Sequence, residues 1–211
     1  MAAKDPDAGG GSRGPGRPRD ARHDQAILEA TRQILGHEGY RGLTIERVAA
    51  LAGVGRPTIY RRWPSKPALV VAALVESARL AVPGSDSGSL RGDLVAVQRH
   101  QVALMSAPEA RRVTAGLIAD LAADPELAEI YVSQYLMPRR AAVWRVLQRG
   151  VDRGELNPDT DFAFAYDLLV GPLFMRAVVW GQPLAPNAAE ATANVILATY
   201  GTRPDSTRPQ R

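Results

Sequence analysis

Residues Thr44–Lys66 contain the pattern that most restricts the fold of this chain, two short helical segments separated by a glycine turn. In the first segment, apolar residues recur at the spacing i, i+3, i+4, i+7, which places them on one face of a helix. These residues are Ile45, Val48, Ala49 and Ala52. Gly53 follows and suits the positive φ of a tight turn, with Val54 available to fill the corner. The pattern therefore predicts a short helix that ends in a sharp turn.

The segment Arg56–Trp63 fits a second short helix after this turn. Pro57 is tolerated in the first helical turn, where its missing N–H is not needed, and Ile59 is the expected inward anchor. Two short helices joined by a turn that contains glycine form the helix-turn-helix pattern. On the outward face, hydrogen bonds to phosphates or base edges can come from Arg56, Thr58, Tyr60, Arg61 and Arg62. We interpret this face as a DNA-reading surface.

The distribution of charge supports this interpretation. Residues 1–80 contain 13 Lys and Arg against 8 Asp and Glu, whereas residues 81–211 contain 13 against 14. The net charge of +4 therefore comes from the N-terminal third, as expected of a nucleic-acid footprint. The alternative is a helical small-molecule-binding or catalytic protein in which the hairpin is purely structural. Salt distinguishes the two, because DNA binding weakens steeply as the salt concentration rises.

The stretch Thr44–Leu69 resembles the DNA-binding signature of the tetracycline-repressor (TetR) family. The matching elements are T-I-x-x-V-A, A-G-V, T-I-Y and W-P-S-K-x-x-L, and Ile27–Gly39 resembles the first helix of the family. Two positions depart from the signature. Gly55 replaces a common Ser, which could have capped the recognition helix, and Pro67 stands where an acidic residue is frequent.

This resemblance implies a ligand-responsive transcriptional repressor that binds a palindromic operator as a homodimer and is released by a small-molecule inducer. Arg56, Thr58 and Arg61 would then read base edges. Phosphates would be held by Thr44, Tyr60, Arg62, Trp63 and Lys66, with Pro57 in the same interface. Action without an inducer, or as an activator, is the remaining alternative within the family.

Helical spacing continues through the rest of the chain, and no strand pattern of period 2 competes with it. We therefore predict an all-α protein of about nine helices. Four parts are expected: a disordered basic arm over residues 1–19, a helix-turn-helix DNA-binding domain of three helices over 20–66, a helical ligand-binding and dimerisation domain over 67–202, and a frayed tail over 203–211. The predicted helices outside the hairpin are Asp20–His37, Lys66–Leu80, Ser89–Ser106, Glu109–Ala123, Pro125–Arg153 with a bend near Pro138, Asp159–Trp180 and Asn187–Tyr200.

The N-terminal arm is poor in apolar side chains and rich in Gly, Pro and Arg, which predicts disorder. It contains Arg17 and Arg19, and arginine on a narrow extended backbone can enter an A·T-rich minor groove. We therefore include both residues among the candidate DNA contacts. The alternative is a solubilising tail.

The segment Phe162–Trp180 is apolar nearly all round, so a helix there needs cover on two sides. The segment Asn187–Tyr200 carries small residues at helical spacing, which suits close packing of helices. Pairing of both helices with their symmetry mates predicts a two-fold dimer interface that contains Phe162, Leu169, Leu173 and Val195. The alternative is a central core helix in a larger monomeric bundle.

A pocket for a small molecule is expected among the helices between residues 66 and 180. The candidate lining residues are His100, Met105, Leu117, Tyr131, Tyr135, Trp144, Phe174 and Arg176. Most of these also fit a plain core. Arg176 is the exception, because an ionised group in so apolar a helix needs a carboxylate partner or an anionic ligand.

Enzymatic and metal-binding functions find little support. The three histidines are scattered, and neither a catalytic-triad order nor a phosphate-cradling loop occurs. Asp120, Asp124 and Glu126 surround a helix end and are interpreted as solvent-facing caps. We therefore predict a protein that is not an enzyme and that needs no cofactor or metal.

The chain has no cysteine, which fits a reducing compartment, and its N-terminus has no apolar h-region. The segment Phe162–Trp180 is long enough to suggest a membrane span, but it contains Asp167 and Arg176. A soluble, cytoplasmic protein without a membrane partner is expected.

Overall fold

The computed structural model describes residues 17–79 and 86–202, and of residues 17–20 and 79 it describes only the backbone. Among these residues, β pairing is limited to an isolated bridge between Leu156 and Gly201. The all-α prediction is confirmed, and the number of helices agrees when contiguous segments are counted together. The segments are α1 (Arg17–Gly42), α2 (Ile45–Ala52), α3 (Arg56–Tyr60), α4 (Lys66–Arg79), α5 (Leu90–Ser106), α6 (Pro108–Ala123), α7 (Pro125–Tyr131), the π-helical η1 (Val132–Leu136), α8 (Met137–Asp152), α9 (Phe162–Phe174), the π-helical η2 (Met175–Val179) and α10 (Ala188–Tyr200).

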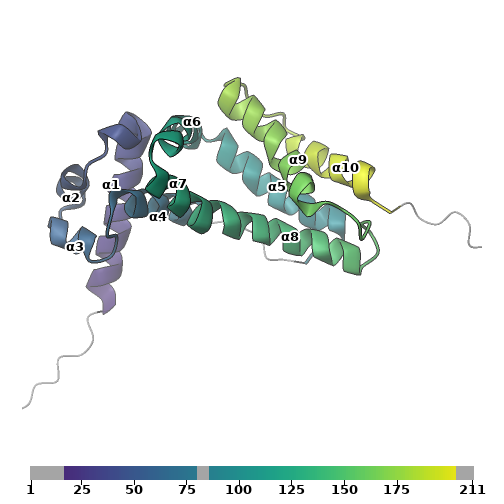
Figure 1. The fold of residues 1–211 in the computed structure, drawn as a ribbon, viewed down its shortest axis with the longest axis horizontal. Coiled ribbons are helices and arrows are strands. Elements are labelled where there is room, and N and C mark those ends of the chain that lie inside the picture. Colours follow the sequence, from purple (N-terminus) through teal and green to yellow (C-terminus); the bar gives the residue numbers. More distant parts are fainter. Residues whose placement is uncertain (1–16, 80–85, 203–211) are drawn as a thin grey trace, which may run out of the picture.

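The molecule is elongated, with α1, α2 and α3 at one end and α9 and α10 at the other (Figure 1). The long α8 runs between the two ends. In the N-terminal half α4 packs chiefly against α1, and in the C-terminal half α10 packs chiefly against α5. The predicted arm up to residue 16, most of the predicted loop before α5 and the tail from residue 203 lie outside the described residues.

Buried apolar side chains form two clusters. In the first, Ile27 of α1 and Ile59 of α3 share a core with Leu69 of α4, Leu117 of α6 and Leu127 of α7. The second cluster lies among α5, α8, α9 and α10. The boundary predicted between residues 66 and 67 is therefore not a break in packing, because α4, α6 and α7 share a core with the helix-turn-helix.

The helix predicted to begin at Asp159 begins at Phe162. Asp161 caps it, because its carboxylate accepts hydrogen bonds from two backbone N–H groups of the first turn. Asp159 belongs to the preceding turn, where its backbone N–H donates to the side chain of Asn157 at 2.9 Å. Both residues are able to cap a helix, so residue type alone does not distinguish the actual start.

A bend was predicted near Pro138, and the structure has a change of helix pitch close to this residue. A proline ring lacks the N–H for the helix ladder and collides with the carbonyl four residues earlier. The structure has a π-helical turn, η1, directly before Pro138, and a second one, η2, shortly after Pro172 in α9. Such turns are frequent at functional sites, and η1 contributes Tyr135 to a cavity described below.

Candidate nucleic-acid interface and cavities

The helix-turn-helix begins and ends as its local sequence requires. The Thr44 hydroxyl accepts a hydrogen bond from the Arg47 N–H at 3.3 Å, and α2 buries Ile45, Val48 and Ala49. Gly53 ends the helix at a φ of 67°. The predicted apolar face and glycine turn are thus both present, and Thr44 caps the helix.

Replacing Gly53 with alanine is expected to lower the free energy of unfolding by about 1–2 kcal/mol, since a Cβ is strained in the left-handed region. The strain comes from φ alone, because nothing lies within 4 Å of the added atom. Denaturant unfolding measures the difference. Gly116→Ala is the matched control, because Gly116 lies inside α6 with equally open surroundings, and alanine there is expected to stabilise the helix. Equal effects at both positions would contradict the expected strain.

The recognition segment is shorter than predicted, since α3 ends at Tyr60 and Arg61 closes it. Ile59 is fully buried and anchors the helix. Gly55 at the N-terminus provides no side-chain cap, as expected where a serine hydroxyl is missing. The exposed residues of this segment are Arg56, Pro57, Tyr60, Arg61 and Arg62, and Thr58 is partly buried.

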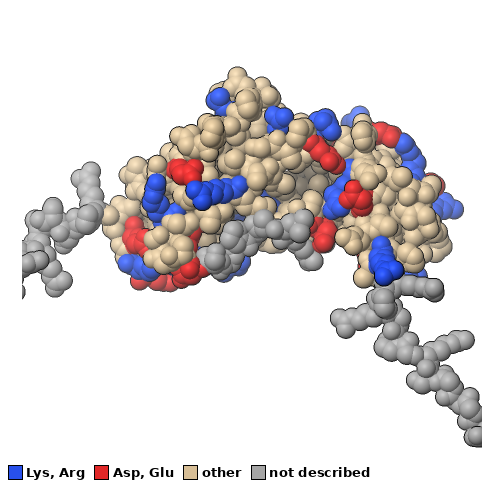
Figure 2. Space-filling view, turned by 180° about the vertical axis from the view of Figure 1, so that it is seen from behind, with Lys and Arg blue, Asp and Glu red and all other residues tan. Residues whose placement is uncertain are grey.

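Ion pairs occupy part of the basic surface. Arg56 donates to Glu46 at 2.8 Å, Arg62 lies 2.6 Å from Asp24, and Arg47 pairs with Glu38. Figure 2 accordingly shows acidic side chains interleaved with basic ones over the end of the molecule that α1 to α3 form. The Arg56–Glu46 and Arg47–Glu38 pairs are exposed and contribute little to stability, whereas the Arg62–Asp24 pair is partly buried. A polyanion can therefore displace the two exposed carboxylates at small cost.

Two candidate phosphate contacts, Trp63 and Lys66, also make contacts within the protein. Trp63 packs, partly buried, against the first apolar cluster. The Lys66 ammonium lies 4.1 Å from the centre of the Tyr40 ring, where the π face attracts it. Burial lowers the pKa of Lys66, and the carboxylates of Asp120 and Asp124 oppose that shift. Lys66 thus lies over Tyr40, near the carboxylates at the junction of α6 and α7.

The predicted arm is also shorter than expected, because α1 already begins at Arg17. The backbones of Arg17 and Arg19 are therefore helical, in the first turn of α1, whereas an extended arm was predicted. Their side chains lie outside the described part of the chain.

A polar junction joins α1 to the helix end between α6 and α7. The Tyr40 hydroxyl donates to Asp124 at 2.7 Å, and Arg41 donates to Asp120 at 3.2 Å. Asp124 also caps α7 by accepting from the Leu127 N–H, and these bonds lower its pKa. Asp120 is only 8% exposed. The prediction of solvent-facing caps is wrong for Asp120, because the fold packs this helix end against α1.

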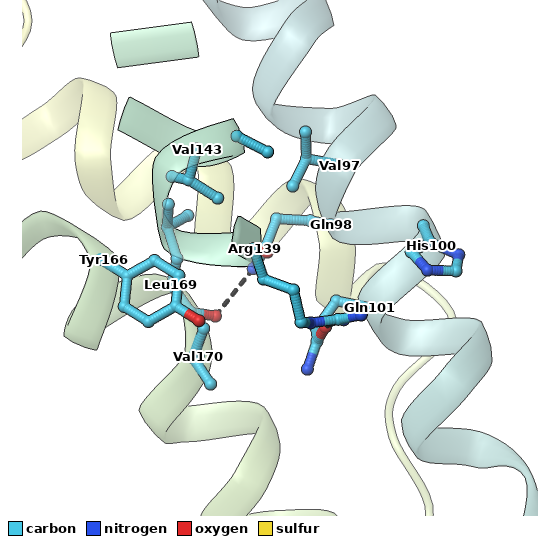
Figure 3. A pocket seen from close by; sticks show the side chains of 10 residues that line it. Val97, Gln98, His100, Gln101, Arg139, Val143, Tyr166, Leu169 and Val170 are labelled. Atoms are coloured by element: carbon cyan, nitrogen blue, oxygen red, sulfur yellow. Dashed lines mark hydrogen bonds between the residues drawn. The ribbon is translucent and has the colours of Figure 1, made fainter. Parts of the chain in front are cut away.

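One cavity lies between α5, α8 and α9, and about 450 Å³ of it is empty, part of this open to solvent. Figure 3 shows Arg139 reaching from α8 toward Gln101 of α5, with Tyr166 and Val170 of α9 on the other side. Arg139 donates to Gln101 at 2.6 Å, and Gln98 donates to the Leu169 carbonyl at 2.8 Å. The cavity is therefore mainly apolar with a cationic end.

A second cavity, of about 900 Å³ with part open to solvent, lies where α1, α4, α5, α6 and η1 meet. Several of its polar lining groups are already paired. Arg32 pairs with Glu29, and the Thr114 hydroxyl donates to the Ala110 carbonyl at 2.7 Å. Its one lining arginine is thus already paired, and a second carboxylate, that of Glu109, lines the same cavity.

Of the predicted pocket residues, His100 lines the first cavity and Tyr135 the second. Tyr131 stacks on Tyr135 with 5.0 Å between the ring centres. Three residues serve packing and line neither cavity, the buried Met105 and Leu117 and the partly buried Phe174.

Trp144 and Arg176 are both exposed, contrary to the predicted pocket lining. Trp144 lies under the Arg140 guanidinium and edge-on to Phe162. Arg176 donates to the Pro183 carbonyl at 2.9 Å, so its exposed charge needs no carboxylate. Sequence reasoning missed the actual polar lining of the first cavity, which is Gln98, Gln101, Arg139 and Tyr166. The run of polar residues from Gln98 to Gln101 was the available signal.

An apolar face is exposed along α9 and η2. Phe164, Met175 and Val179 are 53%, 43% and 55% exposed and recur at helical spacing, and Val195 of α10 is 45% exposed. The predicted interface residues Leu169 and Leu173 are instead buried within the protomer. They lie on the opposite side of the helix, which the all-round apolar sequence could not distinguish. Phe162 is partly buried against the second cluster.

By length and composition, Phe162–Val179 is the one helix in the described residues that could cross a membrane. Only 22% of this helix is buried. Asp167 and Arg176 are exposed on the same helix, and ionised side chains are costly in hydrocarbon. The exposed face therefore fits a protein surface better than a lipid one.

Comparisons with known proteins give consistent matches along the chain. Residues 27–73 match the family described as bacterial regulatory proteins, tetR family, and residues 85–196 match the tetracyclin repressor-like C-terminal domain. The HTH-type transcriptional regulator YdeS of Bacillus subtilis is 32% identical over 79% of this chain and 84% of its own. The DNA-binding transcriptional repressor TetR of Mycobacteroides abscessus is 31% identical over 74% of this chain and 82% of its own. The crystal structure of the TetR family transcription regulator SCO0332 aligns with a TM-score of 0.70 and 29% identity, over 84% of this chain and 97% of that chain.

Proposed function

Because the chain belongs to the tetR family of bacterial regulatory proteins, we propose that it represses transcription from a palindromic operator, which it binds as a homodimer and leaves when a small-molecule inducer binds. It is a transcriptional regulator and a DNA-binding protein, not an enzyme. Regulators of this family bind DNA operators, typically as dimers with small-molecule effectors, and are soluble and normally cytoplasmic. We extend both statements to this chain.

The exposed face of α3 carries the proposal. Ile59 anchors this short helix from behind, and Arg56, Tyr60 and Arg61 remain exposed in front of it. Arginine can contact guanine in the major groove through two hydrogen bonds. Thr44 at the start of α2 is exposed as well and suits a phosphate contact. We therefore retain Arg56, Thr58 and Arg61 as base-reading residues, and Thr44, Tyr60 and Arg62 as phosphate contacts.

The repressor role rests on the relative from Mycobacteroides abscessus, which is named a repressor. Release from the operator by an inducer is supported by the way the helices of the two halves pack together. Because α4, α6 and α7 share the first cluster with the helix-turn-helix, a ligand that shifts them also tilts α3. The Tyr40–Asp124 hydrogen bond crosses the same junction. A coupling of about 1–3 kcal/mol per effector is typical of such systems.

Arg56→Ala is expected to weaken binding to DNA from upstream of the protein's own gene by about 1–3 kcal/mol, the usual value of an arginine that reads a base. Fluorescence anisotropy over a salt series measures this, and the affinity of the wild-type protein is expected to fall steeply with salt. Arg145→Ala is the matched control, since Arg145 is equally exposed but lies on α8. Equal affinities for Arg56→Ala and the wild-type protein would refute the assignment of α3. DNA binding that is insensitive to salt would refute the proposed function itself.

A further inference from the structure

We propose that the effector is a singly charged carboxylate with an apolar body, whose carboxylate binds Arg139 in the cavity between α5, α8 and α9. The inference rests on the proposed function in assuming that an effector exists, and it adds the chemical class of that effector. The cavity, the partners of Arg139 and the atoms left without partners support it.

The walls of the cavity suit an apolar body. Aliphatic side chains from three different helices line it, namely Val97 of α5, Ala142 and Val143 of α8, and Leu169 and Val170 of α9. Polar groups gather on the Arg139 side, where Gln101 and His100 also line the cavity. A largely apolar pocket with a few convergent polar groups is the usual form of a small-molecule site.

Among the residues that the structure describes, no carboxylate pairs with the charge of Arg139. Its Nη2 donates to the neutral amide of Gln101 at 2.6 Å, and its Cζ lies 5.0 Å from the centre of the Tyr135 ring. Its Nη1 is buried and lacks a hydrogen-bond partner, and within the described residues no carboxylate forms a salt bridge with Arg139. A buried donor on a charged group is costly unless something accepts from it. A ligand oxygen would remove that cost.

His100 offers a second contact but no second charge. Burial, and then the charge of Arg139, lower the pKa of His100, so its imidazole is neutral near pH 7. Its Nε2 is buried and also lacks a hydrogen-bond partner. The cavity therefore combines one full positive charge with one neutral polar atom, which matches a monoanion better than a doubly charged phosphate.

Other ligand classes fit less well. A cation would be repelled by Arg139, and a neutral alcohol would leave the guanidinium charge unmatched. A carboxylate is planar and matches the guanidinium fork with two parallel hydrogen bonds. In the second cavity the corresponding arginine, Arg32, is already paired with Glu29, so that cavity gives no such preference.

The test compares the dissociation constants of three probes with the same chain length, octanoate, 1-octanol and octylammonium. They are measured by isothermal titration calorimetry with the full chain at pH 7.5. Octanoate is expected to bind more tightly than either of the others. Arg139→Gln is expected to weaken octanoate binding by roughly tenfold or more, as removal of a charged hydrogen bond does, and to leave octanol binding little changed. The matched control is Arg145→Gln, which removes the same charge from an exposed position on α8.

Arg139→Lys retains the charge without the planar fork, so it is expected to keep part of the preference for octanoate, and circular dichroism checks that each variant is folded. The proposal is overturned if octanoate does not bind, if octanol or octylammonium binds as tightly, or if folded Arg139→Gln binds octanoate as the wild-type protein does. If Arg139→Gln does not fold, the test rests on Arg139→Lys. The proposal is then overturned if Arg139→Lys binds octanoate as tightly as the wild-type protein does and shows no preference for octanoate over octanol. Operator binding is measured separately without any probe, so a failure of the proposed function remains distinguishable from a failure of the effector class.

Discussion

Replacing Asp93 with alanine is expected to lower the free energy of unfolding by about 3 kcal/mol, because the change removes a buried acceptor shared by several donors. The Asp93 side chain is only 1% exposed. It accepts hydrogen bonds from Arg149 at 3.1 Å, from Arg153 at 3.3 Å and from the Ser87 N–H at 2.7 Å. These bonds hold the start of α5 against the end of α8. Both arginines are partly exposed, so solvent limits the loss.

Denaturant unfolding followed by circular dichroism measures this loss. Asp152→Ala is the matched control, since Asp152 is an exposed aspartate on α8 that accepts one hydrogen bond from Gln148. Its replacement is expected to change the free energy of unfolding by less than about 0.5 kcal/mol. An equally small effect of Asp93→Ala would mean that the buried carboxylate does not stabilise the fold.

The Asp93 carboxylate also determines how the free energy of unfolding changes with pH. Burial by itself raises the pKa of Asp93, but the hydrogen bonds from Ser87, Arg149 and Arg153 outweigh burial and leave the pKa below its ordinary value of about 3.9. Such a group contributes stability above its unfolded pKa, and the contribution is lost as the pH falls through the folded pKa. The difference in stability between the wild-type protein and Asp93→Ala is therefore expected to shrink below about pH 4.

Met175→Asp is expected to convert the proposed dimer to a monomer and to weaken operator binding by roughly 10²–10⁴-fold, because the second half-site is then no longer linked to the first. Met175 lies between Phe164 and Val179 on the exposed apolar face of α9 and η2. If this face pairs with its symmetry mate, the two-fold axis brings two carboxylates into one interface. An unpaired charge in an apolar contact is costly.

Light scattering coupled to size exclusion measures the assembly, and anisotropy measures operator binding. Met137→Asp is the matched control, because Met137 is 47% exposed but lies on α8, away from the proposed interface. It is expected to remain dimeric and to bind DNA as the wild-type protein does. A dimeric Met175→Asp, or a monomeric wild-type protein, would show that α9 and η2 do not form the interface.

Local features of the fold could be predicted from the sequence because they depend on residues within one or two helical turns. The positive φ of Gly53 and the burial of Ile59 are of this kind. The Pro138 irregularity is another, since a proline disturbs the helix wherever it occurs. The start of α9 at Phe162, capped by Asp161, was missed because Asp159 is equally able to cap a helix.

The predicted sites were less accurate, because a side chain's neighbours come from distant parts of the chain. The sequence did not predict that Lys66 meets Tyr40 near the Asp120 and Asp124 carboxylates. Arg139 was not predicted at all, since the cavity it enters is formed by α5, α8 and α9.

The sequence by itself determined the all-α class, the helix-turn-helix and the family of this protein, since spacing and turn residues encode these over short distances. Only the tertiary structure decided that Leu169 faces the core while Met175 faces outward. It also decided that Arg176 is solvated, while the buried Nη1 of Arg139 has no hydrogen-bond partner among the described residues. The physical reason is that helical periodicity determines which residues share a face, whereas the packing of helices distant in sequence determines what that face meets.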